Sequence, residues 1–197
     1  MDKVYTAGVN PHRVAVLAYV ATCLCILFGA YLARPDYPVL VICGESSMGT
    51  WLSGMMLVTL AVLSMLLAMQ RRIFPWVLFT LFFTVLSLDE RFMFHEYFKE
   101  RLLIALRMKP HSWQVICELP VMIGSVIGAG AAALLWKNIR SRSGRVLLSM
   151  AVACGTGSVV IDILCCGVLW EDSLKLIAEM CLVSAFIGMV PLSKEFT

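Results

Sequence analysis

The chain has 197 residues, of which 60% are hydrophobic and 15% are charged, and its net charge is +3. Soluble domains contain about 45–50% apolar and about 25% charged residues, so this composition excludes an ordinary water-soluble domain. The small net charge argues against direct nucleic-acid binding. We therefore expect a single transmembrane domain over residues 1–197, embedded in the lipid bilayer.

Six apolar segments follow one another along the chain, without the alternation of apolar and polar residues that is typical of strands. Backbone groups inside a bilayer must be satisfied within the segment, which favours helices. We predict an all-α polytopic transmembrane bundle with about six spans, at residues 14–33, 51–69, 73–88, 115–136, 146–169 and 174–192. No cleavage site for a signal peptide follows the first segment, so we expect it to be retained.

An amphipathic stretch follows the third span. Residues 91–107 mix charged side chains with Phe92, Phe94, Phe98 and Leu102, and we predict an interfacial helix with these apolar groups facing lipid. The tryptophans also lie near predicted span ends, which is typical of an aromatic belt. They are Trp51, Trp76, Trp113, Trp136 and Trp170.

The distribution of Lys and Arg gives the orientation. With the N-terminus inside, nine of these residues fall on the inner side and seven on the outer side, where five belong to the acid-rich segment after Asp89. We predict a multi-pass protein of the bacterial inner membrane with both termini in the cytoplasm. The inner loop at 137–145 would contact anionic lipid or dock an acidic partner, through Lys137, Arg140, Arg142 and Arg145.

Under this topology the outer side gathers a polar cluster. It contains Asp89, Glu90, His95 and Glu96 after the third span, and Glu171, Asp172 and Lys175 in the predicted turn between spans five and six. Such groups at a helix end mark a functional site or a required salt-bridge network. A salt-bridge network would use Arg91, Lys99, Arg101 and Lys175.

Three acids lie within predicted spans, at Glu118, Asp162 and Glu179. With a turn at 170–175, Asp162 and Glu179 would lie about 12 Å below it, at similar depth. These acids, with Lys175, would form a proton or ion site in the outer half of the bilayer. The alternative is a structural network that fixes helix register.

No cofactor is indicated by the sequence, although a divalent metal held by His95, His111 and a carboxylate stays open. Most of the eight cysteines lie in apolar runs, where a thiol behaves as a small hydrophobe. Cys43 and Cys117 would share the outer side, so a bridge between them also stays open. Gly124 and Gly128 form a GxxxG pattern, for packing within the bundle or for a homo-oligomer.

Two short motifs resemble those of uncharacterised bacterial multi-span membrane proteins. The first is Leu88-Asp89-Glu90 followed, after four residues, by His95-Glu96, and the second is Glu171-Asp172 with Lys175 three residues after Asp172. In this family a glycine often follows the lysine, whereas this chain has Ile177 and Ala178 there. The resemblance brings no known activity. It implies that residues 89–96 and 171–175 belong to one site.

Three functions are compatible with these features. The first is a non-enzymatic membrane subunit, a sensor or anchor with a protein partner, as in bacterial stress or antiviral defence systems. The second is a metal-dependent membrane hydrolase that uses His95 on a lipid. The third is a small ion or proton transporter that uses Asp162, Glu179 and Lys175. The small size and the lack of familiar catalytic motifs favour the first over an enzyme.

Overall fold

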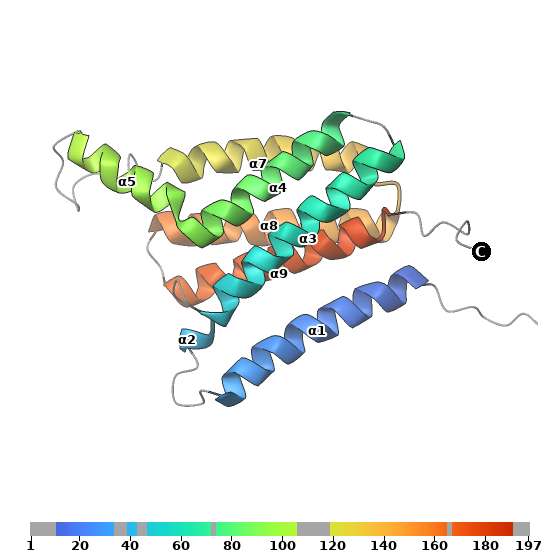
Figure 1. The fold of residues 1–197 in the computed structure, drawn as a ribbon, viewed down its shortest axis with the longest axis horizontal. Coiled ribbons are helices and arrows are strands. Elements are labelled where there is room, and N and C mark those ends of the chain that lie inside the picture. Colours follow the sequence, from blue (N-terminus) through green and yellow to red (C-terminus); the bar gives the residue numbers. More distant parts are fainter. Residues whose placement is uncertain are drawn as a thin grey trace, which may run out of the picture.

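A computed structural model gives the fold and describes residues 11–33, 39–42, 47–71, 74–105, 119–164 and 167–190. All regular structure in these ranges is helical (Figure 1). The helices are α1 (Pro11–Ala33), α2 (Val39–Ile42), α3 (Met48–Arg71), α4 (Phe74–Phe92), α5 (Phe94–Ala105), α7 (Leu119–Asn138), α8 (Arg142–Leu164) and α9 (Val168–Ile187). The prediction of an all-α chain is therefore confirmed.

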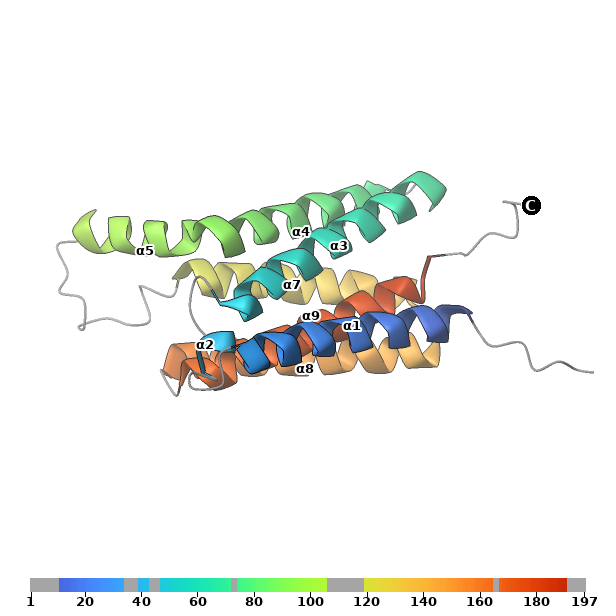
Figure 2. The same cartoon turned by 60° about the horizontal axis from the view of Figure 1, so that its bottom comes forward.

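The six long helices run back and forth along one common direction, as Figures 1 and 2 show. One end of the bundle, called here the α5 end, holds α2, α5 and the start of α9. At the opposite end lie the start of α1 and the end of α9, where the ring Nδ1 of His12 is 3.1 Å from the carbonyl oxygen of Ile187. Each of the six predicted apolar segments corresponds to one of these long helices.

Local capping sets several helix boundaries. Ser47 precedes α3, and its Oγ accepts a hydrogen bond of 3.0 Å from the backbone N–H of Thr50. Ser141 does the same for α8, accepting from Gly144 at 3.1 Å. A serine at this position satisfies one of the backbone donors that the first turn of a helix leaves unpaired. These caps place the helix starts three to four residues before the apolar runs that predicted them.

The turn between α8 and α9 lies earlier than the sequence predicted. The expected turn at residues 170–175 is wrong, because α8 ends at Leu164 and α9 already begins at Val168. Gly167 has a φ of 128°, a backbone conformation that favours glycine, and its carbonyl accepts from the N–H of Trp170 at 3.2 Å. Glu171, Asp172 and Lys175 therefore lie within the first turns of α9.

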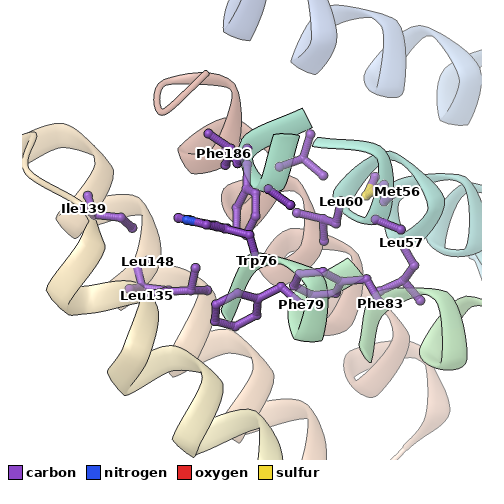
Figure 3. Close-up of a cluster of buried hydrophobic side chains, with 14 of the residues drawn as sticks. Met56, Leu57, Leu60, Trp76, Phe79, Phe83, Leu135, Ile139, Leu148 and Phe186 are labelled. Atoms are coloured by element: carbon purple, nitrogen blue, oxygen red, sulfur yellow. The ribbon is translucent and has the colours of Figure 1, made fainter. Parts of the chain in front are cut away.

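The apolar core lies where α3, α4 and α9 meet, with α7 and α8 against it at the opposite end (Figure 3). Trp76 is 1% exposed, and its ring packs edge-on to Phe186 with 5.9 Å between centroids. Phe83 packs in the same way on Phe186, at 5.8 Å. Edge-to-face pairs of this kind add to the stabilisation that burial gives. The assignment of Trp76 to a lipid-facing belt is thus wrong, since this ring is central to the core.

Within the described ranges, three helices are long and apolar enough to cross a membrane, namely α1, α3 and residues 142–162 of α8. Their burial differs sharply. Half of the apolar window of α3 is buried inside the bundle, against 6% for α1. Cys23 is the buried residue of α1, whereas Leu17, Leu24, Phe28 and Leu32 are exposed. Helix α1 is therefore held along a narrow face only.

Candidate functional site

An ion pair joins the two acidic segments at the α5 end. Lys175 on α9 donates from Nζ to Oε2 of Glu90 in the last turns of α4. The Glu90 side chain is 13% exposed and that of Lys175 is 35% exposed. Lys175 also interacts electrostatically with Glu179 and Asp172. One ammonium group thus serves three carboxylates, and the direct contact goes to Glu90.

A second polar link lies deeper in the bundle. Ser53 on α3 donates from Oγ to Oε1 of Glu179 on α9, at 2.8 Å. Glu179 is 8% exposed, and its other oxygen, Oε2, is buried without a hydrogen-bond partner among the described residues. Glu179 is eleven residues into α9, so it lies about 16 Å from the start of that helix. Glu179 thus lies near the middle of α9, which has 20 residues.

A small cleft connects these two links with the surface. It is lined by residues of α2, α3, α4 and α9, and it has room for roughly one water molecule. Gly49 forms part of the wall. A residue without a Cβ is needed at this position, because any Cβ would collide with the carbonyl oxygen of Ile42. The lining residues are Ile42, Gly49, Thr50, Ser53, Glu90, Asp172, Lys175 and Leu176.

Helix α1 brings a third polar group toward Glu179. The hydroxyl of Tyr19 is buried without a hydrogen-bond partner among the described residues. Tyr19 interacts with the thiol of Cys23, one turn later on α1, and also electrostatically with Glu179. A buried tyrosine hydroxyl normally finds a partner. The Tyr19 hydroxyl and the unpartnered Oε2 of Glu179 thus lie in the same part of the interior.

Asp89 and His95 form a separate unit at the junction of α4 and α5. Asp89 accepts from the backbone N–H of His95 at 2.8 Å through Oδ1, and its Oδ2 is 2.9 Å from the ring Nδ1 of the same residue. Between them Met93 has a φ of 52°, which is rare for a residue with a side chain. Asp89 therefore caps the first turn of α5 across this break. Both of its oxygens are occupied, which fits the structural interpretation of this pair.

The basic residues near the junction do not all pair with acids. The guanidinium of Arg91 lies over the ring of Trp51, 4.5 Å from its centroid. Arg101 donates from Nε to the hydroxyl of Tyr97 at 2.9 Å. Of the four cations expected in a salt-bridge network, Lys175 makes an ion pair in the described part of the chain, whereas Arg91 and Arg101 contact aromatic side chains. The side chain of Lys99 lies outside what the structure describes.

Asp162 and Glu179 do not lie at similar depth, so that expectation is wrong. Asp162 is two residues from the end of α8, about 3 Å along the helix, against about 16 Å for Glu179 along α9. The packing of the two helices agrees, since a Cβ at Gly155 would be 3.8 Å from that of Ala178. The earlier turn at Gly167 is the physical reason.

Several predicted residues lie outside the described part of the chain. These are Glu118, His111, Cys43 and Cys117, and the side chain of Glu96 is likewise not described. The proposed disulfide and the His95–His111 metal site therefore stay predictions. Among the described residues, no three His, Cys, Asp or Glu side chains are grouped so that they could hold a metal ion.

The structure describes the GxxxG pattern and the basic residues near the turn between α7 and α8. A Cβ added at Gly124 or Gly128 on α7 would meet nothing within 4 Å, so no described helix packs on this pair. At the opposite end Lys137, Arg140 and Arg142 are exposed. Arg145 has a structural role, because its Nε donates to the carbonyl of Ile139 at 3.0 Å in the turn between α7 and α8.

Sequence reasoning missed Ser53, Thr50 and Tyr19. Each lies in or beside an apolar segment, where a single hydroxyl is common and carries no pattern of its own. The available signal was the spacing of Gly49 and Ser53, two small residues four positions apart that form one face of α3. Such a face allows another helix to approach closely, and in the structure it faces α2 and Glu179.

The family model of a domain of unknown function (DUF8692) matches residues 13–190. The chain belongs to the DUF8692 family. The matched region contains every residue of the cluster described above, so the polar groups lie within the DUF8692 domain itself. No curated protein and no solved structure matches the chain.

Proposed function

We propose that this DUF8692 protein is a small polytopic protein of the bacterial inner membrane that acts as a non-enzymatic subunit, a sensor or anchor, of a multi-protein system. The observation that carries the proposal is what the charged groups of the polar cluster contact. Its charged groups link helices to one another, α4 to α9 beside a cleft with room for about one water, and α4 to α5 at the separate junction capped by Asp89. A cleft of this size does not admit a lipid headgroup.

The proposed membrane arrangement has six spans, formed by α1, α3, α4, α7, α8 and α9, with α5 at the outer interface. It is supported by the bundle's outer surface, where large apolar side chains are exposed along most of these helices. In water such a surface would be a strong association or aggregation liability. Examples are Leu17 and Phe28 on α1, Met55 and Val62 on α3, and Val126 and Ile127 on α7.

The proposed orientation has both termini in the cytoplasm. Arg13 and Arg71 lie at the opposite end of the bundle, together with the basic turn between α7 and α8. A concentration of Arg and Lys at one end favours the cytoplasmic side for that end. The α5 end, with Glu90, Lys175 and the cleft, would then face the periplasm.

The proposed docking surface for a partner is the turn between α7 and α8. Arg140 and Arg142 are exposed there beside the exposed Lys137. The partner that fits this surface is an acidic cytoplasmic protein, since several cations presented by one short turn attract carboxylates. The neighbouring Arg145 is engaged with Ile139 and so belongs to the scaffold of the turn.

Cross-linking in intact cells followed by purification in mild detergent tests this function. We expect a defined protein partner with the unmodified chain and a loss of most of it with Arg140→Gln and Arg142→Gln together. Arg101→Gln, which removes an exposed charge from the α5 end, is the matched control and should leave the partner bound. A chain that is always isolated alone, or a partner that is insensitive to the double substitution, would refute the proposal.

Ion or proton transport is the second candidate, and the buried Glu179 is the observation that favours it. An ionisable group near the middle of a bilayer often belongs to a transport path. Reconstitution into proteoliposomes with a pH-sensitive dye inside would reveal flux. Transport requires that flux fall to background in Glu179→Gln and stay in Glu171→Gln. If vesicles containing the unmodified protein showed no proton flux above background, this candidate function would be eliminated.

A further inference from the structure

The interior carboxyl group of Glu179 is contacted or faced by groups from four helices. Ser53 on α3 donates to Oε1, while Tyr19 on α1, Glu90 on α4 and Lys175 on α9 itself are its charged or titratable neighbours. On α8, Cys154 faces Cys181 of α9, and Asp162 lies two residues before the end of α8. The environment of Glu179 is therefore defined from every helix that packs around it.

The charge balance at this position is unfavourable for an ionised Glu179. Lys175 is shared among Glu90, Asp172 and Glu179. Glu90 and Glu179 also repel each other, and these two carboxylates with the one ammonium give a net charge of −1 when all are ionised. The lysine contacts Glu90 directly. Glu179 receives one neutral donor, from Ser53, and an ionised carboxylate can accept several more hydrogen bonds than this.

The second oxygen of Glu179 is the atom at which an ionised side chain would lack a hydrogen-bond donor. Oε2 is buried and has no donor among the described residues. An ionised oxygen in this state bears the full cost of its lost hydration, which exceeds the cost of burying a neutral acid. Uptake of a proton forms an O–H bond at Oε2, neutralises Glu179 and changes the net charge of Glu90, Lys175 and Glu179 together from −1 to 0.

We propose that Glu179 is a reversible proton-binding site in the interior of the bundle and that Tyr19 on α1 is the hydroxyl that pairs with it. This deepens the proposed sensor function, on which it rests, by naming the proton as the ligand. The cleft lined by Glu90, Asp172 and Lys175 leads to Ser53, whose hydroxyl contacts Glu179. It provides the path from the α5 end to the site.

Tyr19 gives the site a way to act on the rest of the molecule. Its buried hydroxyl lies beside the thiol of Cys23 and faces Glu179, and its oxygen can accept a hydrogen bond from protonated Glu179. Helix α1 is held along a narrow face that includes Tyr19 and Cys23. A bond gained or lost at Tyr19 therefore changes a large part of what holds α1 to the bundle.

Infrared difference spectroscopy of the full chain in lipid nanodiscs tests the site with the proton itself as the probe. Spectra are compared from about pH 5 to about pH 9, the range in which buried carboxyl groups titrate. We expect a carboxylic-acid C=O band that appears on acidification and shifts in D₂O. It should be lost in Glu179→Gln and kept in the control Glu171→Gln. In Tyr19→Phe the band should persist at a changed frequency.

Two results would overturn the proposal. One is a spectrum without a titrating band that depends on Glu179. The other is a band that vanishes at constant pH when sodium replaces choline, because a metal cation would then be the ligand. If Glu179→Gln does not fold, Glu179→Asp keeps a carboxyl group and should move the band. An unmoved band would assign it elsewhere. The spectra need no protein partner, so this test and the partner test fail independently.

Discussion

Ser53 on α3 donates a 2.8 Å hydrogen bond to Glu179 on α9, two residues that are 126 positions apart in the chain. Both side chains are almost completely buried. The pair therefore links the two helices that form the centre of the bundle, and it gives a buried carboxyl group its one direct donor among the described residues.

Replacement of Ser53 by alanine should destabilise the protein. The change leaves both oxygens of Glu179 without a donor among the described residues, and a buried hydrogen bond between two helices contributes about 1–2 kcal/mol. We expect a lower thermal midpoint in detergent micelles, measured by circular dichroism. Ser149→Ala is the matched control, since Ser149 is exposed and bonds only within its own helix. Equal midpoints for the two variants would contradict the role given to Ser53.

The pair formed by Glu90 and Lys175 should show energetic coupling. Glu90→Gln and Lys175→Met each remove one partner, and the double variant removes both. Because Lys175 is about one-third exposed, solvent screens part of the interaction, and we expect a coupling energy of about 0.5–2 kcal/mol. Thermal or denaturant unfolding of the four proteins gives this value. Strictly additive effects would mean that the contact does not stabilise the bundle.

The sequence predicted the helices well and the turns poorly, for a physical reason. A long apolar run without alternation predicts a helix, and each predicted segment does fold as a long helix. The turn at Gly167 lies inside such a run, where a single glycine with positive φ leaves no trace in hydropathy. The charges of residues 171–175 predict a loop, yet these residues belong to α9, where Lys175 pairs with Glu90.

The candidate site was predictable in part. Charged residues near helix ends stand out in an apolar chain, and this identified Glu90, Asp172, Lys175 and Glu179. Their partners Ser53 and Tyr19 come from distant helices, and no local pattern states which faces of two helices will meet. The charged residues of the site could therefore be predicted from the sequence, whereas the hydroxyl groups of Ser53 and Tyr19 could be identified only from the packing of the helices.

The register of α8 against α9 should be testable by disulfide trapping. A Cβ at Gly155 would lie 3.8 Å from that of Ala178, the mean Cβ separation in disulfides being about 3.8 Å. In a background without the native cysteines, Gly155→Cys with Ala178→Cys should form a cross-link on oxidation in membranes. The mobility of the chain in non-reducing gels, after cleavage at an engineered site in the turn, reports the bond.

Asp162→Cys with Glu179→Cys is the control for this register. If the turn lay at residues 170–175, these two positions would be at similar depth and would cross-link. With the turn at Gly167 they lie at about 3 Å and about 16 Å from their helix ends. The second pair should therefore stay reduced. Efficient cross-linking of the control in preference to the first pair would invalidate the packing of α8 on α9.

The junction of α4 and α5 stores strain that one substitution should release. Met93 has a φ of 52°, a region in which a side chain costs about 1 kcal/mol or more and glycine costs little. Met93→Gly should therefore keep the thermal midpoint or raise it slightly, while Met93→Val should lower it, because a β-branched residue fits this region worst. Met150→Gly is the matched control. Met150 lies inside α8 and is exposed, so glycine there should destabilise by about 0.5–1 kcal/mol. If both glycine variants lost the same stability, Met93 would have ordinary helical geometry and α5 would continue α4 without the break that Asp89 caps.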